Sequence, residues 1–267
     1  MASTQSGHAA LAVVTGASSG MGAEIARELF RRGRPVLAVA RRADRLEALA
    51  AEARKGGHAT VHTLALDVTA PGAAERIRDR ARQLGGLAWL VNDAGFGLYG
   101  PFVEAEPRRL GEMVRLNCET VVVLSRTLLP DIVKAGKDGV LLNVASLGAM
   151  QPMPYMAVYG ATKAFVLSFT EALAEELRDT GVTVSAFCPG PVNTEFGGVA
   201  GTAVRFKDTP SIDAPQAARE GLDGVARRDV VVLSGPWTNQ FAALGRYLPR
   251  GVHRWMARKI LEPWGKA

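Results

Sequence analysis

The sequence predicts an α/β fold: a doubly wound, parallel, seven-stranded sheet with helices on both faces. Short apolar runs rich in valine and leucine alternate with longer amphipathic segments, which is the pattern of repeated strand–helix units. Most of the short runs are apolar without alternation, as expected of strands that are covered on both faces. Such sheets bind their ligands beyond the carboxyl ends of the strands, so we expect the chemistry at that edge.

Seven apolar runs are the expected strands of this sheet. In chain order they are Leu11–Thr15, Pro35–Ala40, Thr60–Leu66, Ala88–Asn92, Gly139–Ala145, Thr183–Cys188 and Asp229–Leu233. Helical periodicity predicts the helices that connect them. These are Met21–Arg32, Ala43–Ala53, Gly72–Leu84, Pro107–Ala135, Met156–Asp179 and Ala214–Ala226.

The length of the chain predicts one domain. A chain of 267 residues can bury a large core and is short enough to form a single dinucleotide-binding and catalytic unit over residues 1–267. Two irregular segments stand out within it. Residues 190–213 contain glycines and prolines and are expected to form a flap over the substrate, and residues 236–267 form a tail expected to be helical.

Composition excludes several classes of protein. The net charge is +6, but the basic residues are scattered and not interleaved with aromatic residues, so we expect no nucleic-acid partner. Cys118 and Cys188 are the only cysteines, and no cluster has metal-ligand spacing, so no metal site is expected. The first nine residues do not resemble a signal peptide, and no apolar run is long enough to span a membrane. These features predict a soluble, cytoplasmic protein.

The segment TGASSGMG follows the first expected strand and opens directly into a helix. Its glycines, Gly16, Gly20 and Gly22, would let the backbone approach a diphosphate, and the helix N-terminus adds N–H donors and the positive end of a dipole. Ser18, Ser19 and Met21 lie in the same turn. This context predicts a dinucleotide site in a Rossmann fold; the alternative is an ordinary tight turn.

Two arginines follow the second expected strand, where an acidic residue would favour NAD(H). Arg41 and Arg42 instead provide guanidinium groups, which bind phosphate through charge-assisted hydrogen bonds. We therefore expect NADP(H) to be favoured over NAD(H). The alternative is that these arginines lie at the end of the strand, face solvent and bind no phosphate.

Five motifs in this order resemble the short-chain dehydrogenase/reductase family, over about residues 11–194. They are TGASSGMG, NDAG at Asn92–Gly95, Asn117 within a helix, Ser146 thirteen residues before YGATK at Tyr159–Lys163, and PGPVNT at Pro189–Thr194. The resemblance implies NAD(P)-dependent carbonyl or alcohol chemistry on a small-molecule substrate. It also implies a catalytic group of Asn117, Ser146, Tyr159 and Lys163. The competing hypothesis is a non-catalytic NADP-binding sensor or scaffold.

The chemistry of this group centres on Tyr159. Reduction of a ketone places negative charge on the carbonyl oxygen, which needs a proton from a positioned acid. Lys163 lies one helical turn further on, and we expect its ammonium, together with the charge of oxidised nicotinamide, to lower the pKa of the tyrosine. Ser146 would bind the substrate oxygen, and the resemblance gives Asn117 a role in holding a water that relays protons. Taken singly, each residue could instead be structural.

The resemblance also assigns the remaining contacts with the cofactor. Besides the glycine turn, Tyr159 and Lys163, these are Asp67, Val68, Asn92, Ala94, Gly95, Pro189, Gly190, Val192 and Thr194. Asp93 departs from the family, which usually has asparagine there. An ionised carboxylate only accepts hydrogen bonds, so any bond donated by the side chain at position 93 is in doubt.

Substrate-pocket residues can be nominated from their places beside these motifs. They are Phe96, Leu147, Met153 and Tyr155. Methionines cluster in the segment from Met150 to Met156, which predicts an adaptable apolar wall and a hydrophobic carbonyl substrate, although methionine at such spacing is also common in cores. The sequence leaves the direction of the reaction open.

The tail contains a candidate amphipathic helix. Val252, Trp255, Met256, Lys259 and Ile260 fall at helical spacing, and basic residues lie on the other face. The helix could pack on the subunit's own core or pocket, lie in an interface between subunits, or lie on an anionic membrane. We favour the first two over membrane association, and the family resemblance implies a homodimer or homotetramer.

Overall fold

Seven parallel strands form the central sheet of the computed structural model, in the order β3-β2-β1-β4-β5-β6-β9. The structure describes residues 10–201, 211–236, 238–240, 242 and 249–262. The strands are β1 (Leu11–Thr15), β2 (Val36–Ala40), β3 (Val61–Ala65), β4 (Leu87–Asn92), β5 (Val140–Val144), β6 (Thr183–Pro189) and β9 (Val231–Ser234). This confirms the predicted fold class and all seven strands.

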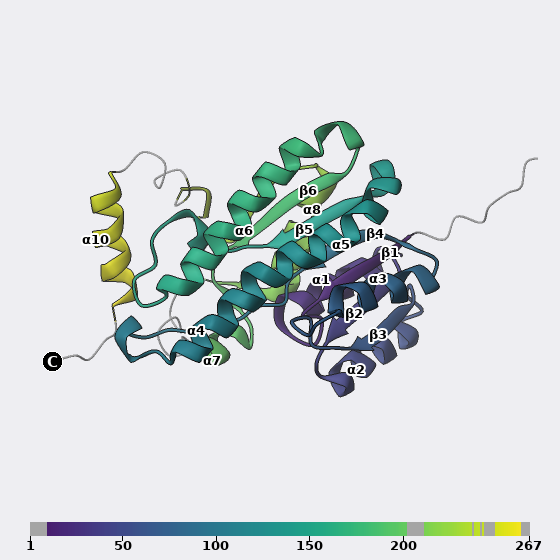
Figure 1. Cartoon of the computed structure of the whole chain (residues 1–267), viewed down its shortest axis with the longest axis horizontal. Helices are drawn as coiled ribbons and strands as arrows, with labels where there is room; N and C mark the ends of the chain where they lie inside the picture. The colour runs from purple at the N-terminus through teal and green to yellow at the C-terminus, as the bar shows by residue number, and fades with distance from the viewer. Residues whose placement is uncertain (1–9, 202–210, 237, 241, 243–248, 263–267) are drawn as a thin grey trace, which may run out of the picture.

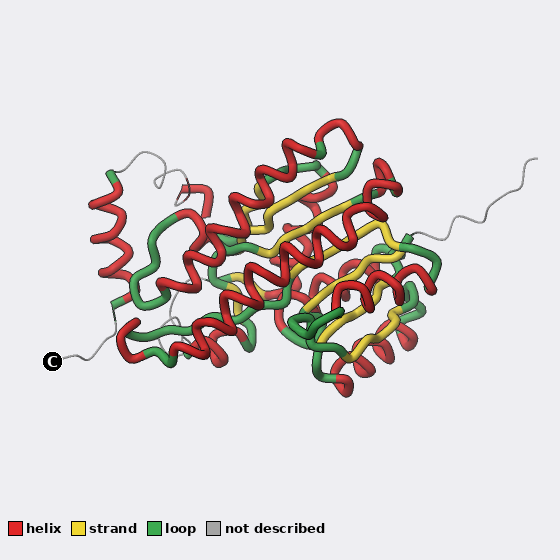
Figure 2. The backbone as a smooth tube through the Cα atoms, in the orientation of Figure 1, coloured by secondary structure: helices red, strands yellow, loops and turns green. Residues whose placement is uncertain are grey.

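Helices cover both faces of the sheet (Figures 1 and 2). One face packs against α1 (Gly20–Arg31), α2 (Ala43–Lys55) and α8 (Ala214–Ala226). The other packs against α3 (Ala73–Gln83), α5 (Thr120–Lys134) and α6 (Ala157–Glu176). In β1, Ala12 and Val14 join the first core, and Leu11 and Val13 join the second. Burial on both faces explains why the strand sequences do not alternate.

The predicted helix from Pro107 to Ala135 is present, but it contains a π-helical turn that the sequence did not predict. The structure has α4 (Pro107–Val114), a π-helical turn at Arg115–Glu119 and then α5. In this turn the Thr120 N–H donates to the Arg115 carbonyl, and the Thr120 hydroxyl donates to the same oxygen at 3.0 Å. A π-turn changes the direction in which the following residues point without changing the helical character of the sequence, so periodicity could not reveal it.

The flap has only short regular elements among the residues described. The flap contains β7 (Val192–Asn193), α7 (Phe196–Ala200) and β8 (Ile212–Asp213), with β7 and β8 paired in parallel. Residues 202–210 lie outside the described part. Within the described ranges, every helix is too short or too polar to cross a bilayer.

The tail forms the predicted helix, α10 (Arg250–Leu261), at the edge of the molecule (Figure 1). It buries Ala257 and Leu261, and the Tyr99 hydroxyl donates to the Leu261 carbonyl at 2.7 Å. Trp255, on the predicted apolar face, is 63% exposed. The subunit's own core therefore does not cover this face, and the role of α10 in an assembly stays a prediction.

A prediction about packing follows from two helical glycines. At Gly224 of α8, a Cβ would lie well inside van der Waals contact with the Val232 methyls of β9, whereas at Gly111 of α4 it would meet nothing within 4 Å. Gly224→Ala should destabilise the fold by about 1–3 kcal/mol through overpacking. Gly111→Ala should stabilise it by roughly 0.5–1 kcal/mol through helix propensity. Thermal unfolding of both variants checks this, and equal effects at the two sites would contradict it.

Candidate active site

The predicted site residues converge at the carboxyl ends of four neighbouring strands. The glycine turn follows β1, Asp93 to Gly95 follow β4, Ser146 follows β5, and Pro189 ends β6. Strand order reverses between β1 and β4, which is the switch point at which ligands of doubly wound sheets bind. The fold therefore brings motifs from across the chain to one edge.

Tyr159 and Lys163 lie one turn apart on α6, and Ser146 faces them from the end of β5. Tyr159 is 8% exposed and Lys163 is 7% exposed, and the Ser146 hydroxyl lies close enough to the phenol to lower its pKa. The Lys163 amine donates to the Val144 carbonyl at 2.7 Å and lies 5.9 Å from the centroid of the tyrosine ring. The Gly148 N–H donates to the Ser146 Oγ at 3.1 Å, which orients this hydroxyl.

The pKa of Tyr159 moves opposite to our expectation. Burial raises the pKa of its phenol to about 12, with Asp93 and Cys188 acting in the same direction and the Ser146 hydroxyl opposing them. Burial also lowers the pKa of Lys163, although Asp93 opposes that shift. Our prediction counted the ammonium and the charge of oxidised nicotinamide but left out desolvation, which here is the larger effect. In this state the tyrosine is held in its neutral, proton-donating form.

Asn117 lies in the π-turn and is 1% exposed. Its Oδ1 accepts the Phe96 N–H at 3.2 Å, and its Nδ2 donates to the Phe96 carbonyl at 3.0 Å and to the Thr162 hydroxyl at 3.1 Å. The amide thus ties the loop after β4 to helix α6. These bonds give Asn117 a positioning role, and its relay of protons through a water stays a prediction.

Asp93 packs against the glycine turn. Its carboxylate lies so close that a Cβ at Gly16 or Gly22 would come within 3.0 or 2.6 Å of Oδ2, and the Gly22 N–H donates to it. The backbone N–H groups of Asp93 and Ala94 both donate to the Thr15 hydroxyl. Burial raises the pKa of Asp93 to about 7, although nearby Lys163 opposes the shift. The side chain at position 93 therefore accepts its structural bond and has no need to donate one.

Asn92 was expected along the cofactor, but its side chain lies within the sheet. It is 4% exposed, and its Nδ2 donates to Asn143 at 2.8 Å and to Ser125 at 3.2 Å. Asn143 donates in turn to Thr170 of α6. This buried network joins β4, β5 and two helices, so a contact from Asn92 to a ligand would have to come from its backbone.

The ends of β2 and β3 carry the expected polar residues. Arg42 donates to the Ser18 hydroxyl at 3.2 Å and to the Ser19 hydroxyl at 2.5 Å. The N–H and hydroxyl of Thr69 donate to Asp67 and lower its pKa, and nearby Arg41 lowers it further. Thr194 lies against Gly20, which places the PGPVNT segment at the start of α1.

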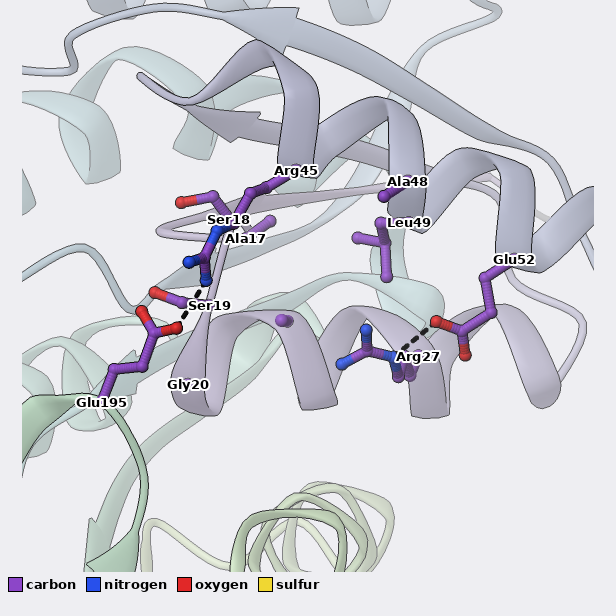
Figure 3. A pocket seen from close by; sticks show the side chains of 11 residues that line it. Ala17, Ser18, Ser19, Gly20, Arg27, Arg45, Ala48, Leu49, Glu52 and Glu195 are labelled. Atoms are coloured by element: carbon purple, nitrogen blue, oxygen red, sulfur yellow. Dashed lines mark hydrogen bonds and ion pairs between the residues drawn. The ribbon is translucent and has the colours of Figure 1, made fainter.

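Sequence reasoning missed Glu195 and Arg45. Glu195 accepts from Arg45 at 2.5 Å and from Arg42 at 3.3 Å. Glu195 and Arg45 both line a cavity of about 460 Å³ between α1 and α2 (Figure 3). Arg45 lies three residues after Arg42, a spacing that could have paired them. No sequence pattern links either arginine to a glutamate about 150 residues away.

The predicted pocket residues take different positions. Tyr155, with a left-handed φ of 63°, lines a cavity of about 330 Å³ together with Leu110 and Met113. Phe96 and Met153 pack in the apolar cluster that contains Tyr159, and Met153 also touches Gly148 and Gly160. Leu147 begins a short 3₁₀ turn and is not among the residues lining that cavity. Reasoning from motifs missed Met113, which is fully buried in the cluster.

The residues at this edge fit a dinucleotide. At Gly16, a Cβ would come within 2.9 Å of the Ala94 nitrogen, so the close approach of the turn to the segment after β4 requires glycine. Gly16 and Gly20 also have positive φ, of 73° and 56°. Serine hydroxyls and an arginine lie at the adenosine end, and a buried lysine and tyrosine lie at the other.

Because Asp93 is buried, we predict that the stability of the fold depends on pH. Its pKa of about 7 exceeds the ordinary value of 3.8, so between these pH values the folded chain holds a proton that the unfolded chain releases. Stability is therefore lost as the pH rises through this window. The Asp93→Asn variant keeps a side-chain oxygen that can accept the Gly22 N–H. It has no carboxyl group to ionise, so it should not lose stability as the pH rises.

Thermal unfolding should show Asp93→Asn raising Tm by roughly 3 °C or more near pH 8 and by little near pH 4. Asp179→Asn, at a side chain that is 90% exposed, is the control and should have little effect at either pH. A gain for Asp93→Asn that is the same at both pH values would contradict the prediction.

Comparisons with known proteins give the family. A family model described as short chain dehydrogenase matches residues 10–203. A protein named uncharacterized oxidoreductase from Myxococcus xanthus is 35% identical over 254 residues, covering 93% of this chain and 96% of that one. A short chain dehydrogenase from Pseudocercospora fijiensis is 35% identical over 190 residues, covering 70% of this chain but only 60% of the relative.

Solved structures agree with the sequence comparisons. A short-chain dehydrogenase from Sphingobium yanoikuyae in complex with NADPH has a TM-score of 0.79 and 30% identity, covering 97% of this chain and 98% of that one. A bulky-bulky ketone specific alcohol dehydrogenase from Comamonas testosteroni has a TM-score of 0.76 and 25% identity, covering 98% of both. With the fold and the convergent motifs, these findings show that the chain belongs to the short-chain dehydrogenase/reductase family of oxidoreductases.

Proposed function

We propose that this protein reduces a bulky, apolar carbonyl compound with NADPH, and that Tyr159 is the general acid. The observation that carries the proposal is the arrangement of Tyr159, close to Ser146 and one turn from buried Lys163, at the edge where the glycine turn lies. A phenol, a hydroxyl and an amine in this arrangement can bind a carbonyl oxygen and protonate it.

The cofactor would lie along the carboxyl ends of the strands. The N–H groups of the glycine turn and the start of α1 would bind its diphosphate. Arg42, with Ser18 and Ser19, would bind the 2′-phosphate, and Lys163 would bind the nicotinamide ribose. When bound, the nicotinamide supplies the hydride. The NADPH complex of the Sphingobium yanoikuyae neighbour supports this choice of cofactor.

The side chains act on the substrate oxygen. Ser146 would donate a hydrogen bond to the carbonyl oxygen and hold it near Tyr159. Tyr159 then passes its hydroxyl proton to that oxygen as negative charge develops on it. A pKa of about 12 keeps the phenol protonated at neutral pH, which is the form that reduction requires and oxidation does not. Lys163 would stabilise the phenolate that remains after transfer.

The surroundings of Tyr159 favour a large apolar substrate. Phe96, Met113, Met156 and Phe196 pack around the tyrosine, and Met113 also lines the cavity of about 330 Å³, together with Tyr155. A cavity of this size, lined mostly by apolar side chains, is typical of small-molecule sites. The likeness to a bulky-bulky ketone specific enzyme supports the same substrate class.

Removal of the tyrosine hydroxyl tests the mechanism. Tyr159→Phe should lower the rate of NADPH-dependent ketone reduction by at least about a hundredfold, because it removes the general acid. Binding of NADPH, measured by calorimetry, should change little. Tyr155→Phe is the matched control and should keep most of the activity. Near-normal turnover by Tyr159→Phe on a substrate that the wild type reduces would sink the assignment.

Filling the cavity tests the substrate class. Leu110→Trp should lower kcat/KM for bulky aryl ketones by about tenfold or more and for acetone-sized ketones by much less, because it occupies the space for the larger group. Val103→Trp, at a side chain that is 90% exposed and not in the cavity lining, is the control. A screen of ketones of graded size with each variant gives the answer, and equal losses for all sizes would contradict a bulky substrate.

A further inference from the structure

Glu195 lies where a negatively charged group of the cofactor would be expected. Its carboxylate bridges Arg42 and Arg45, at 3.3 and 2.5 Å, and Arg42 also donates to the hydroxyls of Ser18 and Ser19. Figure 3 shows the pair of Glu195 with Arg45. Arg42, Ser18 and Ser19 are the groups to which we assigned the 2′-phosphate. The chain thus supplies its own anion to this cluster, from the segment that follows β7.

We propose that Glu195 is a specificity-determining residue that competes with the 2′-phosphate for Arg42 and Arg45. This inference rests on the proposed use of NADPH. A carboxylate and a phosphate cannot both pair with the same edge of a guanidinium group without strong repulsion between them. Binding of NADPH must therefore displace Glu195, whereas NADH carries no group that needs the arginines.

The energetics allow this exchange. The side chains of Glu195, Arg42 and Arg45 are 49%, 42% and 44% exposed, and ion pairs at such exposure stabilise only weakly. A phosphate monoester carries more charge than a carboxylate and has three acceptor oxygens. The phosphate should prevail in the competition, but with lower affinity than it would have in a cluster without Glu195.

Competition between Glu195 and the 2′-phosphate should also affect the surroundings of Tyr159, the proposed general acid. Glu195 directly precedes Phe196, whose ring centroid lies 5.3 Å from that of Tyr159 and whose ring packs against Gly97. The ion pairs of Glu195 therefore help to hold the residue that covers Tyr159. Displacement of Glu195 by the phosphate would loosen this backbone, so NADPH and NADH should leave α7 with different mobility.

The experiment measures binding of NADPH and NADH by calorimetry at low ionic strength. Glu195→Gln should tighten NADPH binding by about three- to tenfold and change NADH binding by less than about twofold, because it removes a charge that opposes only the phosphate. Glu195→Ala should give the same pattern. The gain for NADPH should shrink at high salt, since exposed charges are screened.

Glu52→Gln is the matched control. Glu52 lines the same cavity but pairs with Arg27 and Arg31, so its loss should alter neither affinity by more than about twofold. Hydrogen exchange of residues 193–201 gives a second readout: it should rise on adding NADPH, but not NADH, to the wild type. In Glu195→Gln it should already be raised without cofactor.

The outcomes distinguish a failure of the proposed function from a failure of the proposed role of Glu195. If the wild type binds neither dinucleotide, the proposed function fails. If the wild type binds NADPH but Glu195→Gln tightens both cofactors equally, leaves both unchanged or weakens NADPH, then Glu195 is not a competitor and only this inference is overturned. A gain for Glu52→Gln equal to that for Glu195→Gln would also overturn it, since the effect would then be one of net charge.

Discussion

A buried amine organises the site. Lys163 is 7% exposed, and its charge is stabilised by the Val144 carbonyl at the end of β5 and by the nearby carboxylate of Asp93 after β4. A buried ammonium without such partners would be strongly destabilising. Helix α6 must therefore lie with this face on the ends of β4 and β5, and that position brings Tyr159 to Ser146. The geometry of the candidate site thus depends on stabilising the charge of one buried amine.

Polar networks under the site hold the same strands in register. Asn92 and Asn143 join β4 to β5, and Asn143 reaches Thr170 of α6. The Thr15 hydroxyl receives two N–H groups from the segment after β4. These buried hydrogen bonds favour one arrangement, because any shift of a strand would break them. The edge that carries the candidate site is consequently held in one arrangement.

The sequence predicted the elements that depend on local pattern. Each apolar run became a strand because burial on both faces demands such a run, and the motifs converged because parallel strands bring their carboxyl ends together. It failed where the outcome depends on contacts between distant residues. The π-turn at Asn117 looks helical in sequence, the pKa of Tyr159 depends on burial, and Glu195 meets Arg45 only in the folded chain.

Two carboxylates, those of Asp93 and Glu195, were not predicted as site residues. Both accept hydrogen bonds from groups close to the proposed cofactor site. Asp93 accepts an N–H of the turn at the start of α1, and Glu195 accepts from the arginines after β2. Both lie on groups that attract anions, and the exposed one, Glu195, would meet the 2′-phosphate of the proposed cofactor as a resident negative charge. Binding is then an exchange of partners, and its free energy is a difference between two sets of ionic contacts. Because Asp93 is buried with a pKa near neutrality while Glu195 is half exposed, pH should tune the first of these contacts and salt the second.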